Sequence, residues 1–152
     1  MNNEERGENP YLPRYQQLDA WHLADDLAVD VYRLTRRLPA ETRDLSSQIF
    51  RAAISAPANI AEGYGRASHK EFQQFLVVAH ASLYEVGYFL HFLRRIEMLP
   101  AEKYMVLAAN CQRTSRVLFG LMKSIRAGTA DGEKRRRYLR DEAEVYATNG
   151  SE

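Results

Sequence analysis

The sequence predicts an all-α protein, an antiparallel four-helix bundle with an up-down-up-down path. Four apolar segments, residues 16–38, 42–62, 69–98 and 101–127, are too long for strands and show no alternation of apolar and polar residues. Within each segment apolar residues recur in steps of four and three, which keeps one side of a helix against its neighbours at a shallow crossing angle. The connections between segments are short, so successive helices are expected to run in opposite directions.

Each expected helix has one apolar stripe facing the core, which we call its core seam. Ser68 and Glu71 predict a capping box at the start of the third helix. Gly63 is expected to end the second helix in a left-handed conformation. Pro57 falls inside that helix, where its missing amide predicts a kink. The four seams in chain order are Ala20, Ala24, Leu27, Val31, Leu34 and Leu38; Leu45, Ile49, Ala52, Ala56 and Ile60; Phe72, Leu76, Ala79, Leu83, Val86, Leu90 and Leu93; and Tyr104, Leu107, Cys111, Thr114, Leu118, Leu121 and Ile125.

The 152 residues are enough for one domain. We expect a flexible polar leader over residues 1–15, the bundle over 16–127 and a charged tail over 128–152. Lys and Arg total 21 against 20 Asp and Glu, and this net charge of +1 argues against nucleic-acid binding through the overall charge of the protein. Any basic surface is therefore expected to be local. The leader lacks the apolar core of a signal peptide, and no apolar run approaches about 20 residues, so we expect a soluble, cytoplasmic protein without membrane contact.

The third helix is apolar on more sides than its core seam explains. A helix that is apolar nearly all round is buried nearly all round, and a four-helix monomer would leave one side of it in water. The surplus predicts self-association, because aromatic residues are enriched at the centres of interfaces. The residues predicted at this oligomer interface are Val77, Val78, Tyr84, Tyr88, Phe89 and Phe92.

Candidate catalytic and metal-binding residues are few. His69, His80 and His91 share one side of the third helix, but each step of 11 residues rises about 16 Å, so no two of them can share a metal ion. The single cysteine, Cys111, excludes an intrachain disulfide and multi-cysteine zinc sites, and it lies on a core seam, where a thiol behaves as an apolar group. No motif typical of a serine hydrolase, a zinc protease or a P-loop occurs. We therefore expect no catalytic residue, no metal and no cofactor.

Basic side chains gather on the fourth helix and in the tail. Arg113, Arg116 and Lys123 project within one narrow arc opposite the core seam, and such a stripe can follow phosphates. A symmetric assembly would repeat this stripe around a ring. The alternative is a solvated face that keeps the bundle soluble, followed by a mixed-charge appendage. The candidate nucleic-acid-binding residues are Arg113, Arg116, Lys123, Arg126, Lys134, Arg135, Arg136 and Arg137.

A motif in the second helix carries a family resemblance. Its residues have a plain structural account, in which Ile60 packs and Asn59 or Glu62 satisfies carbonyls or arginines near Pro57. Over residues 18–125 the sequence nevertheless resembles the four-helix bundle proteins of the 23S ribosomal-RNA intervening-sequence family. It departs from them at Ala81, where the family has glycine, and in the tail. The motif comprises Arg51, Pro57, Asn59, Ile60, Ala61, Glu62, Gly63 and Arg66, supported by Trp21, Pro39, Glu41, Phe72, Phe75, Ser82 and Glu85.

The resemblance implies a ring-like homopentamer without enzymatic activity. The similar accessory protein of diversity-generating retroelements binds nucleic acid and a reverse transcriptase through a basic surface of its pentamer. We therefore expect a non-catalytic homopentameric scaffold that binds RNA, DNA or a nucleoprotein partner through a repeated basic surface. The alternative is an adaptor that docks a reverse transcriptase or another protein without contacting nucleic acid.

Overall fold

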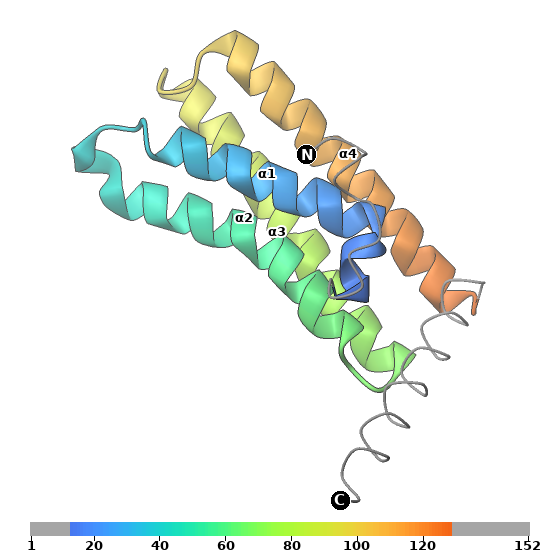
Figure 1. The fold of residues 1–152 in the computed structure, drawn as a ribbon. Helices are drawn as coiled ribbons and strands as arrows, with labels where there is room; N and C mark the ends of the chain where they lie inside the picture. The colour runs from blue at the N-terminus through green and yellow to red at the C-terminus, as the bar shows by residue number, and fades with distance from the viewer. Residues whose placement is uncertain (1–12, 129–152) are drawn as a thin grey trace, which may run out of the picture.

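The computed structural model describes residues 13–128, and the described chain consists of helices without strands. Four helices, α1 (Asp19–Thr35), α2 (Arg43–Tyr64), α3 (His69–Arg95) and α4 (Ala101–Arg126), are joined by short connections. Two single-turn 3-10 helices, η2 (Arg14–Gln17) and η3 (Ala40–Thr42), precede α1 and α2. Figure 1 shows the chain running back and forth, each helix antiparallel to the one before it. The predicted all-α bundle is confirmed.

The helices are arranged in a closed cycle. α2 packs between α1 and α3, and α4 packs between α3 and α1, so each helix has two main neighbours. The cycle closes where the Thr114 hydroxyl on α4 donates a hydrogen bond of 3.4 Å to the Leu23 carbonyl on α1. The other main contacts between the four α-helices join helices that follow one another in the chain.

The predicted core seams form the core. All their members are buried except Leu34, Leu38, Leu45, Tyr104 and Leu121, which are partly buried and pack against the buried cluster. Of the four helices α3 has the most buried residues, and it packs against both α2 and α4. Burial of these side chains is the main stabilising contribution to a fold of this kind.

Helix α3 is long and apolar enough to cross a membrane, judged by length and composition alone. This was not predicted from the sequence, because the helix has no long uninterrupted apolar run. Of the most apolar stretch of α3, a share of 44% is buried inside the bundle. A helix at the core of a soluble bundle has this property, so its apolar character is accounted for in part by the packing just described.

The predicted cap of α3 by Ser68 is confirmed, and the Glu71 side chain reaches back to Ser68 through its hydroxyl. The Ser68 hydroxyl oxygen accepts a hydrogen bond from the Glu71 amide at 3.2 Å, and the same hydroxyl donates to the Glu71 carboxylate at 2.8 Å. This arrangement satisfies an amide that the first turn of a helix leaves without a partner.

Gly63 does not end α2, so that prediction is wrong. The helix continues to Tyr64 and is capped at Gly65 in a right-handed conformation. A Cβ atom at Gly63 would lie 2.5 Å from the Phe75 Cβ and 2.9 Å from the Phe72 ring. The glycine is needed because α3 approaches the α2 backbone too closely at this point for any side chain.

Pro57 is accommodated inside α2 without breaking it. Proline has no amide to donate to the carbonyl four residues earlier. Two residues after Pro57, the Asn59 side-chain amide donates to the Ser55 carbonyl at 2.7 Å and to the Ser55 hydroxyl at 3.0 Å. Asn59 therefore satisfies a carbonyl beside the proline, as the sequence predicted.

We predict that Gly63→Ala lowers the free energy of unfolding by about 1–2 kcal/mol. Because the new Cβ would lie only 2.5 Å from the Phe75 Cβ, the overpacking cost falls in the upper part, about 2–3 kcal/mol, of the usual range. This cost exceeds the gain of about 1 kcal/mol that alanine brings to a helix interior. Urea unfolding followed by circular dichroism measures the difference.

Gly120→Ala is the matched control, because a Cβ on this exposed glycine of α4 would meet nothing within 4 Å. It is expected to raise the free energy of unfolding by about 0.5–1 kcal/mol. If both variants were stabilised, the close approach of α3 at Gly63 would not be a constraint.

Candidate nucleic-acid interface

The excess positive charge of the described chain lies on α4. This helix has Lys103, Arg113, Arg116, Lys123 and Arg126 against a single acidic residue, Glu102. The remaining described residues contain ten basic and ten acidic side chains, which balance. A charge asymmetry of this kind within a nearly neutral protein is a local basic surface rather than a general attraction to anions.

Arg113, Arg116, Lys123 and Arg126 are all exposed to solvent. They project away from the buried side of α4, where Leu107, Cys111, Thr114, Leu118 and Ile125 pack. Within residues 13–128 the ion pairs are Arg33–Asp30 and Arg66–Glu62, so none of the four α4 cations is neutralised by a described carboxylate. Their charges are available to a partner in solution.

Arg113 has a more acidic environment than its neighbours. It borders a cavity of about 540 Å³ that is also lined by Asp25, Asp26 and Asp30 of α1. Burial and then the nearby Asp26 carboxylate raise the pKa of Asp25, whereas His22 lowers it. A phosphate at Arg113 would face these carboxylates, so Arg116 and Lys123 are the better placed members of the predicted stripe.

The outer side of α3 is apolar and exposed. Val77 and Val78 are 47% and 48% exposed, and Tyr84 and Tyr88 are 70% and 60% exposed. These four residues lie opposite or beside the core seam of α3, on a helix whose other side fills the core. In the protomer the outer side of α3 therefore presents several apolar side chains to solvent.

Phe89 and Phe92 differ from the other predicted interface residues. Phe89 is only 9% exposed and packs in the core, so its assignment to the interface is corrected. Phe92 is partly buried, with its ring 6.3 Å from that of Tyr88. The helical periodicity of the sequence predicted that Phe89 is exposed, because this residue lies at the edge of the core seam. In the structure α3 has neighbours on two sides, so the buried part of its surface is wide enough to include Phe89.

Aromatic rings connect the outer side of α3 to the basic helix. The His80 ring lies 5.2 Å from that of Tyr84 and 6.0 Å from that of Phe119 on α4. The Lys123 ammonium stands 5.6 Å from the centre of the Phe119 ring, which is a favourable position for a cation over a π-system. The basic and apolar surfaces are therefore adjacent.

His80 is held as a neutral ring in this cluster. Burial lowers its pKa, and its Nε2 atom lies 2.9 Å from the Ser115 hydroxyl. At neutral pH it adds no charge to the basic surface. Phe119, which is 47% exposed, was missed in the sequence because a single aromatic residue outside a seam carries no periodic signal.

No cluster of metal-binding side chains is present among residues 13–128. Cys111 is buried, and its thiol donates to the Leu83 carbonyl at 3.2 Å. Burial raises the pKa of this thiol to about 11, against a smaller opposing effect of the Gly87 backbone. The group is therefore protonated at neutral pH and is not a nucleophile.

The residues of the α2 motif make contacts inside the protomer. Ile60 is fully buried, and the Arg66 guanidinium pairs with the Glu62 carboxylate across the turn after α2. The guanidinium carbon of Arg66 also stands 4.8 Å from the centre of the Phe75 ring. Arg51 is exposed and donates to the Ser47 carbonyl at 3.4 Å, while Ala61 is partly buried. The basic cluster Lys134, Arg135, Arg136 and Arg137 lies outside the described residues.

The part of the chain that the structure describes is thus a four-helix bundle in which α4 has an excess of basic side chains and α3 has an exposed apolar side. Residues 16–120 match the 23S rRNA-intervening sequence protein family, and the chain belongs to this family. The assignment confirms the resemblance seen in the α2 motif.

Comparison with solved structures also finds this fold. A similar structure is the crystal structure of a protein of unknown function from the S23 ribosomal protein family of Bacteroides thetaiotaomicron, with a TM-score of 0.65 and 26% sequence identity. The match covers 68% of this chain and 95% of the other. No curated protein is significantly similar to the chain.

We predict that Cys111 resists alkylation in the folded protein. Because its pKa is about 11, the thiolate fraction at pH 8 is about a thousandth, and the buried sulfur is shielded from the reagent. Mass spectrometry after treatment with iodoacetamide is expected to show unmodified protein in buffer and full modification in denaturant. Rapid labelling of the folded protein would show that the α3–α4 contact opens readily.

Proposed function

We propose that this chain is a non-catalytic homo-oligomeric scaffold, a pentamer as the family resemblance implies, that binds RNA through a repeated basic surface. The observation that carries the proposal is the segregation of charge, since α4 has five basic residues and one acidic residue while the other described residues balance. Arg116 and Lys123 are its principal phosphate contacts, and Arg113 and Arg126 flank them.

Assembly supports this function by repeating a small surface. One protomer offers few cations, and each phosphate contact contributes modestly to affinity. The exposed apolar residues of α3 lie beside the basic helix, linked to it through His80 and Phe119. Copies joined through α3 would bring several α4 helices into one assembly, so contacts that are weak singly would act together.

Contacts of this type recognise the backbone of a nucleic acid and not its sequence. We therefore expect binding to structured RNA that falls steeply with salt and depends little on base sequence. DNA is expected to bind through the same residues. The tail cluster Lys134–Arg137 is a second candidate contact.

We predict that reversing Arg113, Arg116 and Lys123 to Glu abolishes RNA binding at moderate salt. Removal of three phosphate contacts per protomer reduces the slope of log affinity against log salt by at least about 2. Fluorescence anisotropy with a labelled structured RNA across a salt series measures both effects.

The matched control reverses Arg37, Arg51 and Arg94, which are exposed cations away from α4. It changes the net charge by the same amount and is expected to retain most of the affinity. Equal loss in both variants would mean that total charge, and not the α4 surface, governs binding. Full binding by the α4 variant would refute the assignment.

We predict that Tyr84→Lys combined with Tyr88→Lys converts the oligomer into a monomer. Both side chains are more than half exposed in the protomer, so the change places charges at the expected interface without disturbing the core. Light scattering coupled to size exclusion gives the mass. Met105→Lys, at a residue of α4 that is 67% exposed, is the control and should leave the mass unchanged.

The alternative function is an adaptor that docks a protein, such as a reverse transcriptase, without contacting nucleic acid. One observation favours it: Met105 and Val106, near the start of α4, are 67% and 60% exposed. Exposed apolar residues next to cations suit a protein partner better than a phosphate backbone. An intact oligomer that binds no RNA at low salt would support the adaptor.

A further inference from the structure

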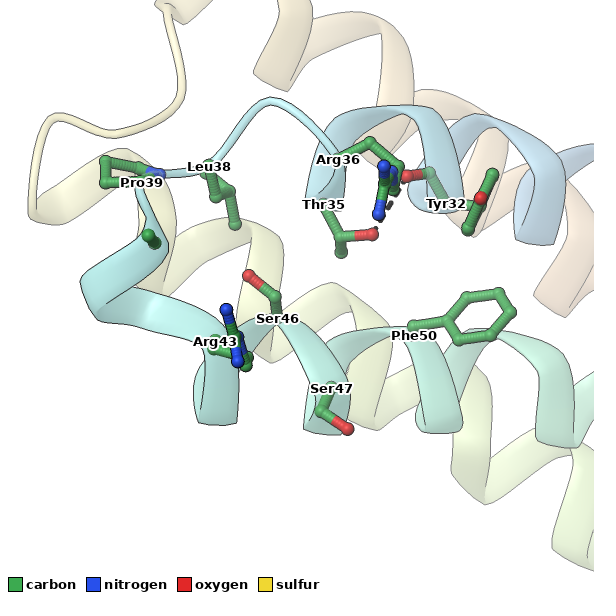
Figure 2. Close-up of a pocket in the computed structure, with 10 residues that line it drawn as sticks. Tyr32, Thr35, Arg36, Leu38, Pro39, Arg43, Ser46, Ser47 and Phe50 are labelled. Atoms are coloured by element: carbon green, nitrogen blue, oxygen red, sulfur yellow. Dashed lines mark hydrogen bonds between the residues drawn. The ribbon is translucent and has the colours of Figure 1, made fainter.

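A separate concave surface lies between the end of α1 and the start of α2. It encloses about 290 Å³, which is at the lower end of the size of small-molecule sites. Figure 2 shows side chains from both helices around this space, with Tyr32 and Arg36 on the α1 side and Arg43, Ser46 and Phe50 on the α2 side. We call it the α1–α2 pocket. The basic residues of α4 do not contribute to it.

The charge of the α1–α2 pocket is entirely positive. Arg36 and Arg43 line it, and no Asp or Glu does. Neither arginine forms an ion pair with another residue in the described part of the chain. Other concave surfaces of the bundle differ, since the one between α1 and the start of α4 includes Asp30 and Glu102. Two uncompensated guanidiniums in one pocket are typical of an anion site, and arginine matches the geometry of phosphate.

The start of α2 strengthens this preference for an anion. A helix N-terminus has a partial positive charge and amides that lack helical partners. At α2 the Arg43 amide donates to the Ala40 carbonyl of the preceding 3-10 turn, and no side chain caps the amides that follow. The Thr42 hydroxyl donates to the Pro39 carbonyl at 2.7 Å. Ser46, in the first turn, adds a hydroxyl to the lining of the same pocket.

Two aromatic rings form another part of the wall. The Tyr32 and Phe50 rings are 5.4 Å apart and tilted by 56°. Tyr32 is 47% exposed, so one face of this aromatic pair is accessible from the pocket side of α1. Aromatic side chains next to arginines are the combination that proteins use to stack a base and hold its phosphate.

We propose that the α1–α2 pocket binds a nucleotide, with the phosphate between Arg36 and Arg43 and the base against Tyr32 and Phe50. The ligand is either a free nucleotide or the 5′-terminal nucleotide of an RNA, because both present the same phosphate and base. The proposal does not depend on the α4 surface, which lies on another helix.

The test is calorimetric titration of the full chain with adenosine 5′-monophosphate, adenosine and inorganic phosphate. The nucleotide is expected to bind saturably, and each of its two parts at least about tenfold more weakly. Arg36→Gln and Arg43→Gln are each expected to weaken nucleotide binding at least about tenfold, as loss of a charged hydrogen bond does. Tyr32→Ala should weaken binding of the nucleotide and leave that of phosphate unchanged.

Arg37→Gln is the matched control, since Arg37 is exposed, adjacent to Arg36 in sequence and outside the pocket lining. It should bind the nucleotide as the wild type does. Absence of saturable binding at millimolar nucleotide, or equal weakening by Arg37→Gln, would overturn the proposal. Retained nucleotide binding in the Arg113, Arg116 and Lys123 reversal variant would show that the pocket acts independently of α4.

The source of the nucleotide is resolved with a short RNA that has either a 5′-phosphate or a 5′-hydroxyl, offered to the α4 reversal variant. A preference for the 5′-phosphate that Arg43→Gln removes would support recognition of an RNA end. Saturable binding of the free nucleotide without any such preference would support a free nucleotide as the ligand.

Discussion

Helix α3 is apolar on two opposite sides, and the rest of the structure depends on this property. One side fills the core from Phe72 to Leu93 and holds α2 and α4 in place. The other side, with Tyr84 and Tyr88, remains in contact with water in a single chain. Since α4 packs directly against α3, whatever covers this outer side also determines how the basic residues of α4 are presented.

The core could be predicted from sequence because every seam obeys the same steps of four and three. Helix ends were less predictable: Ser68 and Glu71 form a local signal that needs no other part of the chain, whereas the role of Gly63 depends on Phe72 and Phe75 of the next helix. A glycine near the end of a helix has two explanations, a left-handed cap or a close approach, and sequence spacing does not distinguish them. Phe89 was also assigned wrongly from the sequence, because its burial depends on the two helices that pack against α3.

The candidate sites also include residues that could be predicted from the sequence and residues that could not. The basic residues of α4 could be found from sequence, because exposure follows from their position opposite a seam. The acidic surroundings of Arg113 could not, since Asp25, Asp26 and Asp30 belong to α1 and reach it only through tertiary packing. The α1–α2 pocket was also missed: Tyr32, Arg36, Arg43 and Phe50 form no motif, and the connection between α1 and α2 brings them together.

The closed order of the helices also constrains how the chain folds during synthesis. Contacts of α1 with α2, α2 with α3 and α3 with α4 each require only a short loop to close, which is typical of fast folding. The contact between α1 and α4, marked by Thr114 and Leu23, requires the ends of the bundle to meet across the whole domain. Until α4 leaves the ribosome, α1 and α3 each lack one neighbour and expose part of their seams. The bundle therefore becomes complete only when its most basic helix is added.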